Sequence, residues 1–188
     1  MGLGHVGADA RGDKICHQYG TQPPIRHYKL IDMKFDPQKH HRHSIRLPGY
    51  DYSLAGAYYV TLVAHDREPL FGEVVEAEMK LSRYGQIVES TWLDLPKHYP
   101  LLELDTFCIM PEHVHAILVL PEDGRRPLSE ILRAFKSYAA RRINLLRKTA
   151  GVPVWQRDYY EHIIRDNADY LAKRKYILDN PMNWKNDK

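Results

Sequence analysis

Hydrophobic and polar positions change their spacing several times along the chain, and each change predicts an element. The segment AGAYYVTLVAHD is rich in β-branched and aromatic residues, which predicts a first strand at about 57–65. The segment SRYGQIVESTWLDLP has helical spacing, with Ser82 as a candidate N-cap, and predicts a helix at about 82–97 that ends near Pro96. The segments LLELDTFCIMP and HVHAILVLP then predict a second and a third strand joined by a tight antiparallel turn.

The last third of the chain predicts two helices around one more strand. Apolar residues recur at helical spacing over 128–149, the segment VWQRDYYEHIIRD predicts a loop and a fourth strand, and NADYLAKRKYILDNP predicts a final helix stopped by Pro181. The segment EPLFGEVVEAEMKLS is expected to form a short hairpin or an irregular arm. This order predicts an α+β fold, a ferredoxin-like β-α-β-β-α-β sandwich with a four-stranded antiparallel sheet and an extra C-terminal helix. The first and third strands would lie at the centre of that sheet.

The N-terminal part has a different character. Residues 1–45 contain six of the eleven histidines and no sustained periodicity, so we expect a flexible extension before a domain at 46–188. The tract KHHRHSIR could bind a metal, although a mobile tail is favoured, and Met33 is an alternative to Met1 as the start. No membrane span and no secretory signal is visible. Cys108 lies in an apolar run and is expected to be a free thiol, which favours a cytoplasmic protein without disulfides.

Charge is unevenly distributed along the chain. The net charge is +3, but residues 133–188 contain thirteen Lys and Arg against six Asp and Glu. This surplus indicates a polyanionic partner, with nucleic acid as the first candidate, or a solvated helical surface. On the helix at 128–149, the residues expected to contact phosphates are Lys136, Arg141, Arg142, Arg147 and Lys148.

The segment MPEHVHAILVL is apolar enough for a buried strand, yet it contains His113 and His115. Strand side chains alternate between faces, so both imidazoles project to one face, roughly 7 Å apart along the strand, while Val114 points into the core. The pair can serve as two ligands of one divalent cation. Two core histidines that bond to the backbone remain the alternative.

A third ligand would have to come from another element, and the final helix offers candidates. Tyr176 and Asn180 are four residues apart and therefore share a helix face. An amide oxygen suits Mg²⁺ or Mn²⁺, and a tyrosine beside such an ion could act as a covalent nucleophile. A tyrosine packed on the sheet is the simpler interpretation of Tyr176.

Several segments in order resemble one family. PEHVHAILVLP resembles the HUH motif of the single-strand DNA transposases of the insertion-sequence 200 type, and the match is closest to the REP-associated tyrosine transposases. HHRHSIRLPGYDYSLAGAYYVTL resembles the opening of such proteins, VWQRDYYEHIIRD their W-Q-R and E-H-x-I-R segment, and YLAKRKYILDNPMNW the helix with their tyrosine. The similarity runs from about Met33 to Trp184.

The resemblance implies a role for each matching residue. His113 and His115 would be metal ligands for Mg or Mn, Asn180 the third ligand and Tyr176 the nucleophile, while His162 and Arg165 would lie near the active site and the DNA backbone. The substrate would be single-stranded or hairpin DNA, cleaved and rejoined through a 5′-phosphotyrosine. Aromatic residues of DYYEH could stack on unpaired bases. The protein would be a monomer or a homodimer, and in a homodimer Tyr176 could serve the partner's histidines.

Three other functions share parts of this pattern. An H-x-H nuclease would activate water and form no covalent intermediate. A non-catalytic single-strand nucleic-acid-binding module would bind without a divalent ion. A relaxase or rolling-circle initiator usually has a third histidine ligand and often a second tyrosine, and neither motif is visible in this sequence.

Overall fold

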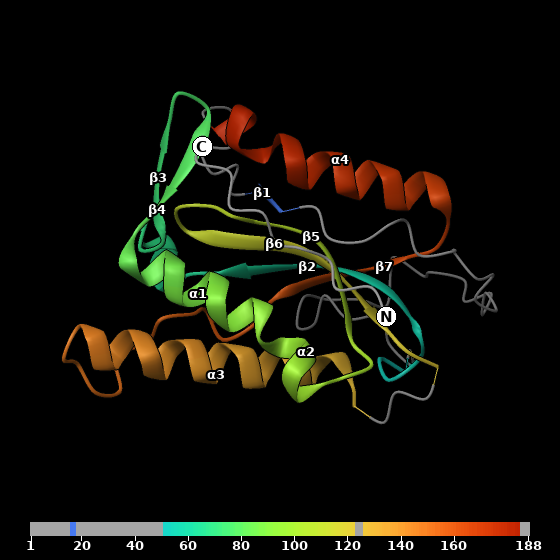
Figure 1. Cartoon of the computed structure of the whole chain (residues 1–188), viewed down its shortest axis with the longest axis horizontal. Coiled ribbons are helices and arrows are strands. Elements are labelled where there is room, and N and C mark those ends of the chain that lie inside the picture. The colour runs from blue at the N-terminus through green and yellow to red at the C-terminus, as the bar shows by residue number, and fades with distance from the viewer. Residues whose placement is uncertain (1–15, 18–50, 123–125, 185–188) are drawn as a thin grey trace, which may run out of the picture.

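The computed structural model, which describes residues 16–17, 51–122 and 126–184, has a five-stranded antiparallel sheet with helices on both faces (Figure 1). In chain order the elements are β1 (Cys16–His17), β2 (Gly56–Val63), a 3₁₀ turn (His65–Arg67), β3 (Gly72–Val75), β4 (Glu78–Leu81), α1 (Arg83–Leu93), α2 (Leu95–His98), β5 (Glu103–Ile109), β6 (His113–Leu120), α3 (Leu128–Leu146), β7 (Tyr160–Ile164) and α4 (Asn167–Asn183). The α+β class and the extra C-terminal helix are therefore confirmed.

The sheet has the strand order β1-β5-β6-β2-β7, and every pair in it is antiparallel. The first and third predicted strands, β2 and β6, lie at its centre as expected. β3 and β4 form the separate hairpin that was expected as an arm. The two residues of β1 extend the sheet beside β5, and the rest of the expected extension at 1–45 lies outside the described residues.

Alternation along the central strands divides their side chains between two cores. Val60 of β2 and Val114 of β6 are fully buried on one face, where α1 and α3 cover them with Trp92 and Phe135 among others. The prediction for Val114 is confirmed. On the opposite face α4 covers a smaller cluster that contains Tyr59, Cys108, Met110, Ile117, Ile164, Tyr170 and Ile177. The sheet thus separates a large apolar core from a face with polar residues.

Two helix boundaries differ from those predicted. Ser82 caps α1 by accepting hydrogen bonds from the backbone N–H groups of Tyr84 and Gly85, but the predicted helix at 82–97 divides at Asp94 into α1 and α2. Pro96 lies in the first turn of α2, where its missing N–H costs no helical bond. The prediction that Pro181 stops the final helix is wrong, because α4 continues to Asn183. In the last turn a proline removes one hydrogen bond without preventing the turn.

Cys108 is disulfide-bonded, so the predicted free thiol is wrong. Its Cα lies opposite that of Cys16 across the β1–β5 pair. The two residues are far apart in the sequence, so their spacing could not reveal this pairing of strands. In the described part of the chain, no helix is long and apolar enough to cross a membrane.

A buried polar cluster fixes α4 on the sheet. The Tyr170 hydroxyl donates a short hydrogen bond to Oδ2 of Asp105, and Nε of Arg174 donates to Oγ1 of Thr106 at 2.9 Å while lying 3.3 Å from Oδ1 of Asp105. Burial, followed by the bond to Asp105, raises the pKa of Tyr170 above its ordinary value. Two side chains of α4 one turn apart are thereby tied to two neighbouring residues of β5, which sets the position of the helix.

Replacing Tyr170 by Phe should lower the free energy of unfolding by about 1–3 kcal/mol, because one oxygen of the buried Asp105 carboxylate loses its donor. Urea denaturation measures the change. Tyr138→Phe is the control, since Tyr138 is 50% exposed on α3 and should change stability by less than about 0.5 kcal/mol. Equal effects of the two substitutions would show that the cluster does not hold α4.

Candidate active site

His113 and His115 lie side by side at the start of β6, on the face that α4 covers. Their ring centres are 4.4 Å apart, and both side chains are buried. Both residues belong to the central strand β6, which pairs with β5 on one side and with β2 on the other. The hydrogen bonds to these two strands restrict the backbone beneath the rings. The two imidazoles therefore share one face as predicted, and their role as metal ligands stays a prediction.

Two hydroxyl groups of β2 orient the ring of His115. Nδ1 lies 2.7 Å from the hydroxyl of Tyr59 and 2.9 Å from Oγ1 of Thr61. An Nδ1–H that donates to one of these hydroxyls leaves the Nε2 lone pair for another ligand. Burial, followed by the neighbouring His113, holds the pKa of His115 well below its usual range, so the ring is neutral at pH 7. The neutral imidazole is the form that binds a cation.

One stripe of α4 runs alongside the two imidazoles. Tyr176, Asn180 and Trp184 follow one another at intervals of four residues, so they share a helix face. The ring centre of Tyr176 is 5.2 Å from that of His115, and the ring centre of Trp184 is 5.8 Å from that of His113. Asn180 lies between these two contacts. The structure thus places Tyr176 beside His115 within one chain, with Asn180 one turn further along the same helix face.

Asn180 is 1% exposed, and neither its Oδ1 nor its Nδ2 has a hydrogen-bond partner among the described residues. A buried amide without partners is costly, and it usually marks an atom or ion that completes the site. An amide oxygen near a pair of imidazoles suits a divalent cation such as Mn²⁺ or Mg²⁺. No cluster of three or more His, Cys, Asp or Glu occurs in the part of the chain that the structure describes, so an amide as third ligand is consistent with the geometry.

Sequence reasoning missed three residues of this site. Tyr59 and Thr61 orient His115 from β2, and Nζ of Lys173 lies 5.1 Å from the ring centre of Tyr59. Lys173 precedes Tyr176 by three residues on α4, so the helical spacing K-x-x-Y could have indicated it. The proximity of Tyr59 and Thr61 to His115 depends on the register between β2 and β6, which the sequence does not reveal.

His162 of β7 and Arg165 of the following loop, both predicted to lie near the active site, contact the first turn of α4. His162 pairs across the strands with Tyr59, and its Nε2 lies 2.7 Å from Oδ2 of Asp169. The backbone N–H of Arg165 donates to the same carboxylate oxygen at 3.3 Å, and its side chain is exposed. His162 therefore lies on the same face as the imidazole pair, and Asp169 orients it.

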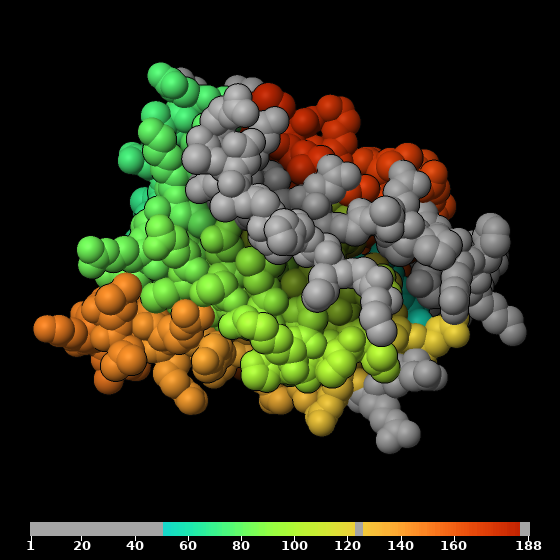
Figure 2. Space-filling model, in the orientation of Figure 1, coloured from blue at the N-terminus to red at the C-terminus, as the bar shows by residue number. Residues whose placement is uncertain are grey.

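The predicted phosphate-binding residues of α3 lie on the other side of the sheet. Figure 2 shows α3 along one border of the molecule and α4 along the opposite border. Lys136 donates to the backbone carbonyls of Gln156 and Arg157, and Arg142 donates to the hydroxyls of Ser90 and Thr91. Arg141 is exposed. Much of the hydrogen-bonding capacity of Lys136 and Arg142 is therefore used within the fold, and a role of these three residues in DNA binding stays a prediction.

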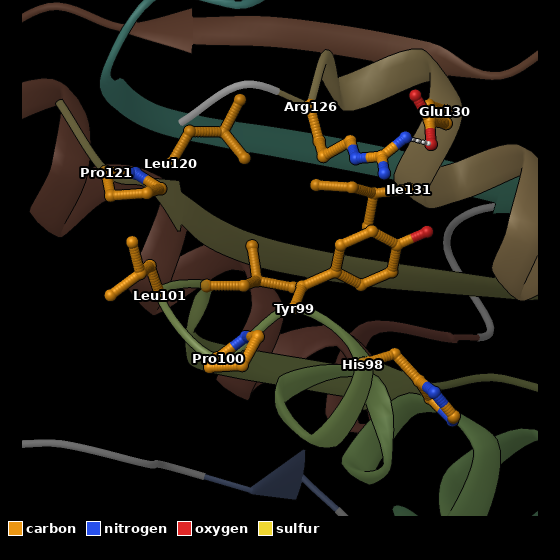
Figure 3. Close-up of a pocket in the computed structure, with 10 residues that line it drawn as sticks. His98, Tyr99, Pro100, Leu101, Leu120, Pro121, Arg126, Glu130 and Ile131 are labelled. Carbon is orange, nitrogen blue, oxygen red and sulfur yellow. Dashed lines mark hydrogen bonds and ion pairs between the residues drawn. The ribbon is translucent and has the colours of Figure 1, made fainter. Parts of the chain in front are cut away.

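A pocket of about 540 Å³ lies apart from these residues, between α2, α3 and the ends of β5 and β6 (Figure 3). Its lining is mainly apolar, with Tyr99, Leu101 and Leu120 among its walls. The two charged residues, Arg126 and Glu130, form an ion pair at 2.7 Å. None of the residues around the imidazole pair lines it.

Comparison with known proteins decides the family. The model of the family described as "Transposase IS200 like" matches residues 57–180, from the first residues of β2 to Asn180. The chain belongs to the IS200-like transposase family. It is accordingly an enzyme that cleaves and joins DNA, and the resemblance drawn from the motifs is confirmed.

Proteins similar to this transposase include one uncharacterized protein and two REP-associated tyrosine transposases. An uncharacterized protein of Haemophilus influenzae is 35% identical over 82% of this chain and 96% of its own length. A REP-associated tyrosine transposase of Escherichia coli is 32% identical over 43% of this chain and 44% of its own length. A solved REP-associated tyrosine transposase bound to a REP hairpin has 22% identity and a TM-score of 0.57, covering 76% of this chain and 74% of that one, which shows a shared fold.

Replacing Asn180 by Leu should raise the free energy of unfolding by about 1–3 kcal/mol in EDTA, because a side chain of similar size then fills the site without an unsatisfied amide. Urea denaturation in EDTA checks this. Adding Mn²⁺ should raise the melting temperature of the unaltered protein more than that of the variant. A variant less stable in EDTA, or equally stabilised by Mn²⁺, would contradict the assignment of Asn180 as a ligand.

Proposed function

We propose that this transposase cleaves and rejoins single-stranded DNA beside hairpin sequences, through a covalent bond between Tyr176 and a 5′-phosphate. The observation that carries the proposal is the position of Tyr176. Its side chain is 46% exposed and its ring centre is 5.2 Å from that of the buried His115, in the same chain. The phenol is thus open to a nucleic acid strand and adjacent to the proposed ligands.

In the proposed cleavage step, the phenol oxygen of Tyr176 forms a bond to the phosphorus while the bond from phosphorus to the 3′ oxygen breaks. The phenol proton passes to the solvent that reaches this half-exposed side chain. The leaving 3′ oxygen keeps the bonding electrons and takes up a proton, giving a free 3′-hydroxyl. A 3′-hydroxyl then attacks the phosphotyrosine and releases the phenol, so rejoining needs no external energy source.

His113, His115 and Asn180 would hold a divalent cation, for which the buried, partnerless amide and the neutral imidazole are fitted. When bound, this cation would supply Lewis-acid polarisation of the scissile phosphate and stabilise the tyrosine anion. Such assistance matters because the ordinary pKa of a tyrosine side chain is about 10.

Other residues of the chain would prepare the site for this chemistry. Tyr59 and Thr61 hold the His115 ring in one orientation, and the Asp105–Arg174 cluster sets the position of the helix that carries Tyr176. Lys173, one turn before Tyr176, places a positive charge where a DNA phosphate could lie. The hairpin substrate is proposed because one relative of this fold was solved with a REP hairpin.

Tyr176→Phe should abolish the covalent adduct with a single-stranded or hairpin oligonucleotide but leave binding within about twofold, because only the attacking oxygen is lost. A denaturing gel detects the adduct, and fluorescence anisotropy detects binding. Tyr138→Phe, a tyrosine exposed on α3, is the matched control and should form the adduct normally. An adduct that persists in Tyr176→Phe would exclude Tyr176 as the nucleophile.

His113→Ala, and separately EDTA, should reduce adduct formation by at least about 100-fold, since loss of one imidazole or of the cation removes the charge that assists attack. The gel assay with added Mn²⁺ or Mg²⁺ measures both effects. His98→Ala, a histidine remote from the imidazole pair, should leave the rate unchanged. Full adduct formation in EDTA would argue against metal-dependent cleavage, and cleavage without any adduct would favour a nuclease that activates water.

A further inference from the structure

A row of side chains crosses the sheet on the face of the imidazole pair. Cys108 of β5 pairs with His115 of β6, His115 with Thr61 of β2, and Thr61 with Tyr160 of β7. Residues opposite one another in an antiparallel sheet project to the same face. Tyr160 therefore points to the same side of the sheet as His115, two strands away from it.

Tyr160 lies at an exposed edge of the sheet. It is 39% exposed, and β7 is an edge strand of the sheet, so no further strand covers it among the described residues. Its ring contacts that of Tyr59 edge to face, with ring centres 6.2 Å apart. Tyr59 in turn lies 6.3 Å from Tyr176 in the same edge-to-face manner. Two exposed tyrosines thus flank one buried tyrosine, and one of the two exposed rings belongs to the proposed nucleophile.

The neighbouring residue Tyr159 has a different place. It packs against the large core on the opposite face, together with the residues that α1 and α3 cover. Adjacent strand residues alternate between faces, so only one of the two tyrosines in DYYEH can face the imidazoles. The structure selects Tyr160.

The surroundings of Tyr160 suit an unpaired nucleotide. An exposed aromatic ring offers a surface on which any base can stack, and Lys173 beside Tyr59 offers a positive charge for the backbone phosphate. A base held there would belong to a nucleotide within a few positions of the phosphate at Tyr176. We propose that Tyr160 is a stacking platform for an unpaired base that flanks the scissile phosphate. This inference rests on the proposed function of Tyr176.

The test measures binding of a hairpin oligonucleotide with a flank of about six thymidines, and of the same hairpin with an abasic flank. The measurements use fluorescence anisotropy with Tyr176→Phe as the background and EDTA present, so no cleavage or metal is involved. Tyr160→Val removes the ring but keeps a good strand former, and it should weaken binding of the thymidine flank by roughly 5- to 100-fold. Binding of the abasic flank should change by less than about twofold, since no base is left to stack.

Two further variants make the result specific. Tyr160→Phe keeps the ring and should bind the thymidine flank within about twofold of the background. Tyr138→Ala removes a more exposed tyrosine from α3 and should have no effect. Equal weakening of both flanks by Tyr160→Val, or equal losses for Phe and Val, would overturn the inference. Failure of the unaltered protein to form an adduct would instead count against the proposed function, so the two failures are distinguishable.

Discussion

The packing of α4 against β5 and β6 is the contact on which the active site depends. The imidazoles belong to a central strand, whereas the tyrosine and the amide belong to the last helix of the chain. The smaller apolar cluster packs α4 onto the sheet. The buried ties from Tyr170 and Arg174 to Asp105 and Thr106 then fix both the height of the helix above the sheet and its rotation. A buried ion pair is a modest source of stability, but it is well suited to specify one arrangement.

The two faces of the sheet have different tasks. The face under α1 and α3 is almost wholly apolar and contributes most of the buried hydrophobic surface. The face under α4 contains histidines, hydroxyls and the buried amide of Asn180. This amide has no hydrogen-bond partner among the described residues, so it reduces stability unless a ligand completes it. The larger core can therefore stabilise the fold, while the face under α4 retains polar groups suited to a reaction. Such a division is common where an enzyme trades stability for function.

Much of the fold followed from the sequence because its elements have clear periodicity. The four long strands, the helix at 128–149 and the shared face of the two histidines each rest on local patterns, as does the helical stripe from Tyr176 to Asn180. What could not be predicted depends on register or on distant contacts. Tyr59 and Thr61 reach His115 through the pairing of β2 with β6, and Cys108 lies opposite a cysteine far away in the sequence. The predicted helix divides at Asp94 and α4 continues past Pro181, because a proline is tolerated in the first turn of α2 and in the last turn of α4.

Tyr176 lies beside His115 of its own chain, and this has a kinetic consequence. A centre assembled from one polypeptide does not dissociate on dilution. If Tyr176 is the nucleophile as proposed, cleavage would be first order in protein, and activity in a cell would rise in proportion to expression without a threshold.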